Sequence, residues 1–93
     1  MESIIKAAKL RLRKTQTNAL DDDIKNLAEA AIADLKRIGV NEKHLPPNTP
    51  DALIRETVVT FVIANYGKNP ERESLMEAYN MFLIKIKGGK YRD

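Results

Sequence analysis

Residues 51–67 read DALIRETVVTFVIANYG, and this stretch decides the fold. Its middle, from Thr57 to Ile63, is rich in β-branched residues, which are typical of strands. The apolar pattern nevertheless runs for longer than a usual strand, and Gly67 follows it like the glycine that ends many helices. We therefore predict a helix over residues 51–66 that is apolar on nearly every side.

A helix that is apolar on nearly every side must bury its surface against other helices. A chain of 93 residues hides only ~60–70% of its unfolded surface, so a lone copy is expected to be marginally stable. Three short neighbouring helices would leave part of residues 51–66 bare. The sequence therefore predicts that this helix also packs against another copy of the chain.

The helix on the C-terminal side is predicted over residues 70–86. Asn69 is a favoured cap residue, Pro70 suits the first helical position, and Gly88 with Gly89 ends the pattern. Its apolar residues recur at helical spacing and form one stripe: Leu75, Met76, Ala78, Tyr79, Phe82, Leu83 and Ile86.

Two helices are predicted on the N-terminal side, over residues 2–13 and 21–38. The second opens with three aspartates, one of which is expected to cap it, and Gly39 ends it. Both carry an apolar stripe, made by Ile4, Ile5, Ala8 and Leu12 in the first and by Ile24, Leu27, Ala28, Ala31, Ile32, Leu35 and Ile38 in the second.

Three prolines between residues 46 and 50 exclude a helix there, so residues 40–50 are predicted to form a stiff loop. The expected fold class is all-α, with one domain over residues 1–93. It is a compact cluster of about four helices, over residues 2–13, 21–38, 51–66 and 70–86, followed by a short basic C-terminal tail.

The composition, with 43% hydrophobic and 31% charged residues, is ordinary for a soluble globular domain. The chain has no cysteine, which removes disulfides, thiolate metal sites and thiol nucleophiles together. No apolar run is long enough to span a membrane, and the N-terminus does not read as a signal peptide.

No motif points to catalysis. His44 is the only histidine, and Glu42 is the only possible metal ligand close to it in sequence, which is too few for a metal site. Capping explains Asp21 to Asp23 better than calcium binding does. Phosphate-binding glycine motifs and a nucleophile with its base are also missing. We expect no enzyme activity, no cofactor and no metal.

Charge gathers at the ends of the chain. Residues 1–14 carry a net charge of +4, residues 15–84 carry −4, and residues 85–93 carry +3. Such ends can simply be solvated, or they can attract an acidic partner, DNA or another copy. Tyr91 is either part of a free tail or an anchor in a neighbouring subunit, since Tyr and Arg are favoured at interfaces. The candidate protein-interface residues are Lys85, Lys87, Lys90, Tyr91 and Arg92.

The order of motifs carries a resemblance. Residues 51–56 are followed by the apolar helix, by Asn65-Tyr66-Gly67, by a last helix with Tyr79 and Phe82-Leu83, and by Tyr91. The set also includes the two predicted N-terminal helices and the residues Gly39-Val40 that follow the second of them. Together these motifs resemble the head–tail connector family of tailed bacteriophages. The resemblance covers almost the whole chain.

The resemblance implies a non-catalytic virion assembly protein. Such a subunit forms a ring of about a dozen copies under the portal of the capsid, extends the DNA channel and provides a platform for tail attachment. Its partners are the portal, later head-completion or tail proteins, and packaged DNA passing without sequence-specific binding. It is assembled in the bacterial host cytoplasm, becomes part of the virion, and can stay monomeric until the portal nucleates the ring.

Two alternatives remain open from the residues. A small basic helical chain also suits a helix-turn-helix DNA-binding protein, although only Arg55 is basic between residues 51 and 66 and few side chains there could read bases. A helical scaffold or toxin–antitoxin partner is the other alternative.

Overall fold

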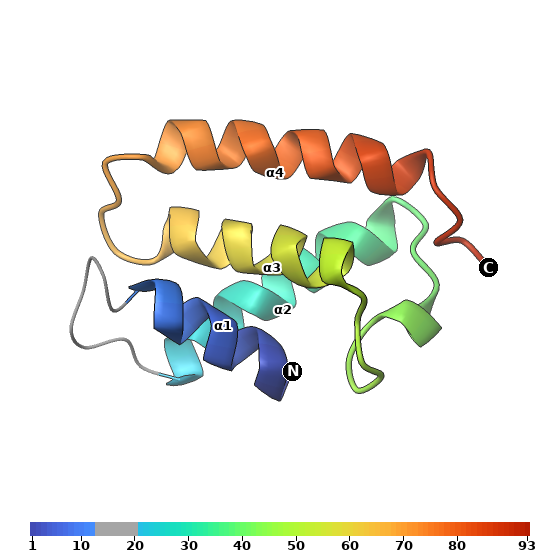
Figure 1. Ribbon diagram of the computed structural model, residues 1–93, viewed down its shortest axis with the longest axis horizontal. Helices are drawn as coiled ribbons and strands as arrows, with labels where there is room; N and C mark the ends of the chain where they lie inside the picture. Colours follow the sequence, from blue (N-terminus) through green and yellow to red (C-terminus); the bar gives the residue numbers. More distant parts are fainter. Residues whose placement is uncertain (13–20) are drawn as a thin grey trace.

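The computed structural model describes residues 1–12 and 21–93. They form four α-helices and a short 3-10 helix (Figure 1), and there is no strand in these two ranges, so the all-α prediction is confirmed. The helices are α1 (Glu2–Leu12), α2 (Asp21–Arg37), η1 (Glu42–His44), α3 (Ala52–Asn65) and α4 (Arg72–Lys87). Helices α1 and α2 start where predicted, and the other bounds of the four α-helices differ from the predicted ones by one or two residues. The predicted end of the first helix at residue 13 lies outside the described residues.

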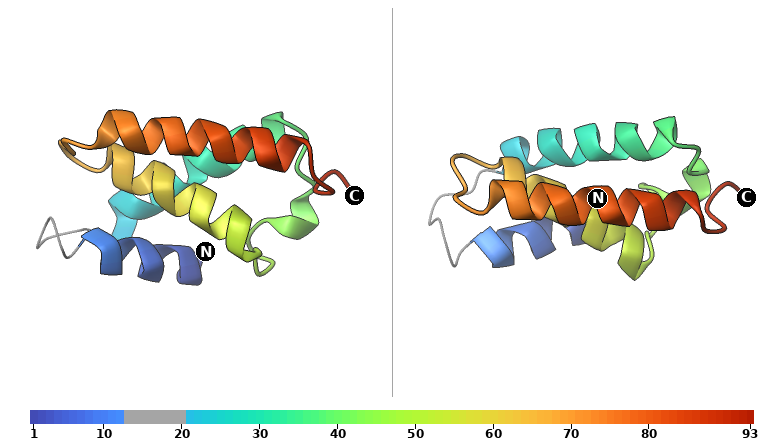
Figure 2. Two further views of the ribbon diagram at one scale, coloured as in Figure 1. Left: turned by 45° about the horizontal axis from the view of Figure 1, so that its top comes forward. Right: turned by 90° about the horizontal axis from the view of Figure 1, so that it is seen from above.

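Helix α3 is the centre of the fold. It contacts all three other α-helices; α4 lies on one side of it, α1 lies on the other, and α2 lies behind it in Figure 1, as the two views of Figure 2 also show. Eight of its fourteen residues are buried: Ile54, Thr57, Val58, Val59, Thr60, Val62, Ile63 and Ala64.

The single chain buries more than half of α3, although Leu53 and Phe61 remain half-buried. Packing of this helix against a second copy stays a prediction. Small residues of α1 and α2 belong to the same core. Ala8 on α1 and Ala28 and Ala31 on α2 are each fully buried, and short side chains leave room for close packing of helices. The buried Thr57 is satisfied locally, since its hydroxyl donates to the Leu53 carbonyl at 2.7 Å.

The ends of α2 and α3 follow from their sequences. Gly39 has a φ of +101°, and the amide of Val40 donates to the Leu35 carbonyl at 3.0 Å, which is the glycine-terminated helix end that the sequence predicts. Asp51 caps α3 by accepting a bond from the Ile54 amide at 2.9 Å. The aspartates at the start of α2 lie inside its first turn, so none of them precedes the helix as its cap.

The turn between α3 and α4 is held by Asn69. The side-chain NH2 group of Asn69 donates to the Ile63 carbonyl at 3.1 Å, and its side-chain oxygen accepts from the backbone amide of Glu71 at 2.8 Å. Pro70 and Glu71 therefore form a turn, and α4 begins two residues later than predicted. Farther along α4, the Tyr79 hydroxyl donates to Asp34 of α2 at 2.9 Å, which ties the outermost helix to α2.

The loop over residues 40–50 contains one turn of 3-10 helix that the prolines did not suggest. Asn41 caps this turn by accepting from the Lys43 amide at 3.0 Å. The turn ends at His44, before the first proline, so the prolines do not interrupt it. Leu45 and Val40 are buried in the core, and the loop is thereby part of the packed structure.

Candidate functional site

Residues 88–93, which we call the C-terminal segment, fold back onto their own chain. The Asn41 amide donates to the Tyr91 carbonyl at 2.7 Å. The Tyr91 hydroxyl donates to Oδ2 of Asp51 at 2.5 Å. Because Asp51 is also the cap of α3, the C-terminal segment is tied both to the loop before α3 and to the start of that helix.

Two further contacts hold the C-terminal segment. The rings of His44 and Tyr91 meet edge to face at 5.2 Å between centroids, and His44 Nε2 lies 2.9 Å from the main-chain oxygen of Asp93, to which it can donate. The Arg92 side chain packs over Gly39, where an added Cβ would lie 3.3 Å from Nε. Tyr91 is therefore half-buried in its own subunit. Of the two alternatives for this residue, the free tail is wrong, and an anchor in a neighbouring subunit stays a prediction.

The contact between Tyr91 and Asp51 changes the pKa of both side chains. Partial burial, the hydrogen bond to Asp51 and the negative charge of that residue raise the pKa of Tyr91 to about 12. Burial raises the pKa of Asp51, but the hydrogen bonds from the Ile54 amide and the Tyr91 hydroxyl, with the nearby His44, outweigh it and leave the pKa below its usual value. Both shifts favour the protonated phenol beside the ionised carboxylate.

The other candidate interface residues lie on the surface. Lys85 and Lys87 belong to the last turn of α4, and Lys90 and Arg92 follow in the C-terminal segment; all four are exposed. They form a basic end of the molecule that a partner could reach. The contacts of Tyr91 and Arg92 also imply that removing residues 88–93 costs stability.

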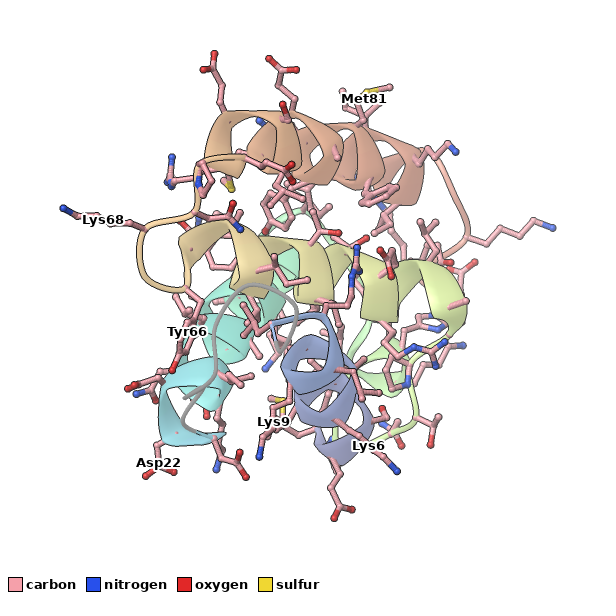
Figure 3. The ribbon with its side chains drawn as sticks, turned by 60° about the vertical axis from the view of Figure 1, so that its left-hand side comes forward. Lys6, Lys9, Asp22, Tyr66, Lys68 and Met81 are labelled. Carbon is pink, nitrogen blue, oxygen red and sulfur yellow. The ribbon has the colours of Figure 1, made fainter. Side chains whose placement is uncertain are left out.

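Sequence reasoning missed an exposed apolar surface on α4. Met81 is 66% exposed and Ile84 is 72% exposed, and Figure 3 shows Met81 projecting from α4 on the side away from α3. Helical periodicity could have revealed this surface, because positions 81 and 84 fall opposite the buried Tyr79 and Ile86. Among the residues that the structure describes, Leu10 on α1 is the third large exposed apolar side chain, at 54%.

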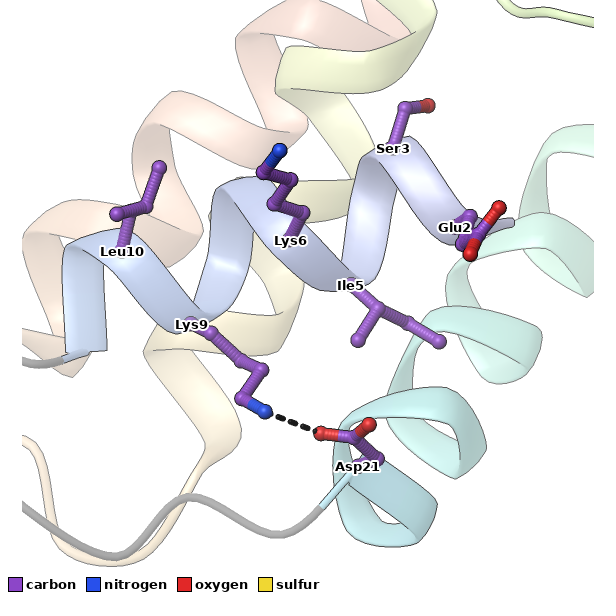
Figure 4. Close-up of a pocket in the computed structure, with 7 residues that line it drawn as sticks. All are labelled: Glu2, Ser3, Ile5, Lys6, Lys9, Leu10 and Asp21. Atoms are coloured by element: carbon purple, nitrogen blue, oxygen red, sulfur yellow. Dashed lines mark ion pairs between the residues drawn. The ribbon is translucent and has the colours of Figure 1, made fainter.

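An open hollow of about 610 Å³ runs along α1 and the start of α2 (Figure 4). An ion pair of 2.7 Å between Lys9 and Asp21 crosses it. Its lining combines charged side chains with Ser3, Ile5 and Leu10. Acyl-transfer chemistry requires a nucleophile hydrogen-bonded to a base, and in the described part of the chain the Ser3 hydroxyl forms no such bond.

The described residues show neither a metal-binding cluster nor a membrane-spanning helix. The described residues hold no group of three or more His, Cys, Asp or Glu side chains placed to bind a metal ion. Among the helices of the described part, none has the length and apolar character to cross a membrane.

Comparisons with protein-family models, with curated proteins and with solved structures each found no match.

Proposed function

We propose that this chain is a non-catalytic assembly subunit that forms the head–tail connector ring of a tailed bacteriophage. The proposal rests on the ordered set of motifs that resembles the connector family. In the ring, about a dozen copies would sit beneath the portal, extend the DNA channel and present a surface to tail proteins. The virion is the proposed location, after assembly in the host cytoplasm.

One observation on the fold carries the proposal further: the large exposed apolar side chains lie on two helices on opposite sides of α3. Leu10 is on α1, and Met81 and Ile84 are on α4, with α3 between those helices (Figure 1). A ring subunit must contact one neighbour on each side through different surfaces. Apolar contacts on two sides meet that requirement.

The basic end would supply the docking contact with the portal. Lys85, Lys87, Lys90 and Arg92 are exposed, and clustered cations attract an acidic surface over roughly 10 Å at moderate salt. In this proposal Tyr91 acts through its contact with Asp51, by holding the C-terminal segment in position for its basic neighbours.

The DNA-binding alternative receives less support. A recognition helix must offer side chains to the major groove, whereas α3 is enclosed by the other three helices and its two charged residues, Arg55 and Glu56, are only half-exposed. Salt-dependent binding of duplex DNA by the isolated protein would favour this alternative.

The proposal is tested first by gene order and then by assembly. Portal and capsid genes beside the coding sequence are expected. The protein, mixed with heads that carry that portal, should then appear by electron microscopy as a ring under each portal. A variant with Lys85, Lys87 and Lys90 changed to Gln should lose docking, whereas the matched variant with Lys25, Lys43 and Lys68 changed to Gln should keep it. Heads that never acquire the protein would refute the proposal.

A further inference from the structure

The outward side of α4 has an ordered pattern of charge. We define the outer face of α4 by six exposed residues: Glu73, Glu77, Met81, Ile84, Lys85 and Lys87. The acids occupy the first half of the helix, the lysines occupy the last turn, and the two apolar side chains stand between them. None of these four charged groups forms an ion pair with another residue of the described chain.

A face with this order is complementary to itself when it is reversed. A second copy of α4 running in the opposite direction brings its lysines beside the acids of the first, and its acids beside the lysines of the first. The same reversal places Met81 and Ile84 of one copy against those of the other. We propose that the outer face of α4 binds the same face of a second copy in an antiparallel, two-fold symmetric pair.

Other pairings fit the charges less well. A parallel pair would set Glu77 beside Glu77 and Lys87 beside Lys87, and like charges at close range are destabilising. The surface of α1 offers a single large apolar residue, Leu10, and its neighbours Lys9 and Arg11 already pair with Asp21 and Glu56 at 2.7 and 2.6 Å. Among these pairings of described residues, the antiparallel α4 pair is the one that joins two apolar side chains from each copy and also sets opposite charges beside each other.

The expected affinity follows from the size of the face. The sixteen residues of α4 span about 24 Å, and a helix with its side chains is about 10 Å wide. One helix pair therefore buries less than the ~1,200–2,000 Å² of a stable interface, so the dimer should be weak and dissociate in roughly the micromolar range. The inference concerns the free protein and stands independently of the connector ring.

The experiment is sedimentation velocity on the full chain from about 1 µM to about 1 mM, which brackets the affinity of a weak complex. The unmodified protein should pass from monomer to dimer over this range. One variant carries Glu73→Lys with Glu77→Lys, and a second carries Lys85→Glu with Lys87→Glu. Each alone should associate at least about tenfold more weakly, because like charges then meet. An equimolar mixture of the two should form a one-to-one heterodimer.

Matched controls separate this pairing from general charge attraction. Lys6→Glu with Lys25→Glu changes the net charge as much as the second variant does, on exposed residues of α1 and α2, and leaves the outer face of α4 intact. This control variant should therefore form a dimer nearly as well as the unmodified protein does. Ile84→Ser should weaken the dimer about tenfold or more, and Leu10→Ser should not. Circular dichroism should show every variant folded.

Three results would overturn the proposal. The unmodified protein could remain monomeric over the whole range. The control variant with Lys6→Glu and Lys25→Glu could lose association as completely as the second variant, or Leu10→Ser could weaken association as much as Ile84→Ser. The outer face of α4 also carries Met81 and Ile84, which are proposed ring contacts, so the free dimer and the ring would use this face at different times. Ring formation is measured separately, on heads that carry the portal, and a monomeric free protein would leave it unaffected.

Discussion

The Tyr91 hydroxyl donates a 2.5 Å hydrogen bond to Asp51, a residue 40 positions earlier in the chain. The same carboxylate accepts a bond from the Ile54 amide. One side chain therefore serves both as the N-cap of the central helix and as the attachment point of the C-terminal segment. The stability of these two regions should be coupled.

A double-mutant cycle on Asp51 and Tyr91 measures this coupling. Tyr91→Phe removes only the hydroxyl and should lower the free energy of unfolding by about 0.5–1.5 kcal/mol. Asp51→Ala also removes a helix cap and should cost about 1 kcal/mol or more. In urea denaturation followed by circular dichroism, the double variant should lose less than the sum of the single losses. Additive losses would show that the two side chains do not interact in solution.

The contribution of this pair should depend on pH at both ends of the scale. The folded pKa of Asp51 is below its unfolded value of about 3.9, so its stabilisation is present above about pH 4 and is lost as the pH falls through the folded pKa. The folded pKa of Tyr91 is raised to about 12 from about 10, so its stabilisation is complete below about pH 10 and is lost as the pH rises toward 12.

The measurement for this pH dependence is the difference in unfolding free energy between the unmodified protein and Tyr91→Phe, taken across the pH range. This difference should be constant near neutral pH and should shrink below about pH 4 and above about pH 10. Tyr79 also has a raised pKa, caused by burial and by Asp34, but it is present in both proteins and its effect cancels. A difference that stays flat from pH 3 to 12 would contradict the prediction.

Two glycines give a matched pair of substitutions. Gly39 has a φ of +101° and lies under Arg92, so Gly39→Ala should destabilise the protein by about 1–2 kcal/mol. Gly88 has a φ of −83°, and an added Cβ there would meet no atom closer than 3.6 Å. Gly88→Ala should therefore be neutral or stabilising by up to about 1 kcal/mol. Thermal unfolding of both variants tests this contrast, and equal effects would contradict it.

Two isoleucines test where the core lies. Ile54 of α3 is fully buried and Ile84 of α4 is 72% exposed. Ile54→Ala should cost about 2–5 kcal/mol by losing apolar burial and leaving a cavity. Ile84→Ala should change the unfolding free energy by less than about 0.5 kcal/mol. A large loss at Ile84 in dilute monomer would mean that α4 is packed differently.

The helices were predictable because their signals are local. In α2 the apolar stripe recurs within one turn, and Gly39 follows immediately with the positive φ that such a helix end needs. Asp51 caps α3 from the position where the pattern starts. Each signal depends on residues three or four positions apart, and the sequence displays that spacing directly.

The contacts of the candidate site were not predictable in the same way. Tyr91 meets Asp51 and His44 because the loop over residues 40–50 returns to the end of α4, and no periodicity encodes an encounter over 40 residues. The extent to which the other helices cover α3 was not predictable for a related reason. Eight of its fourteen residues are buried within the single chain, and that burial depends on how the helices pack together, which no local pattern in the sequence encodes.

The concealment of α3 also protects the protein from aggregation. Residues 57–63 read TVVTFVI, a run with high strand propensity that contains no charge, proline or glycine, and such segments stack into cross-β fibrils when they are bared. Helix α4 lies along this run as part of its cover. Cleavage in the turn around Asn69, or heating that detaches α4, should therefore expose residues 57–63 and allow them to nucleate aggregation.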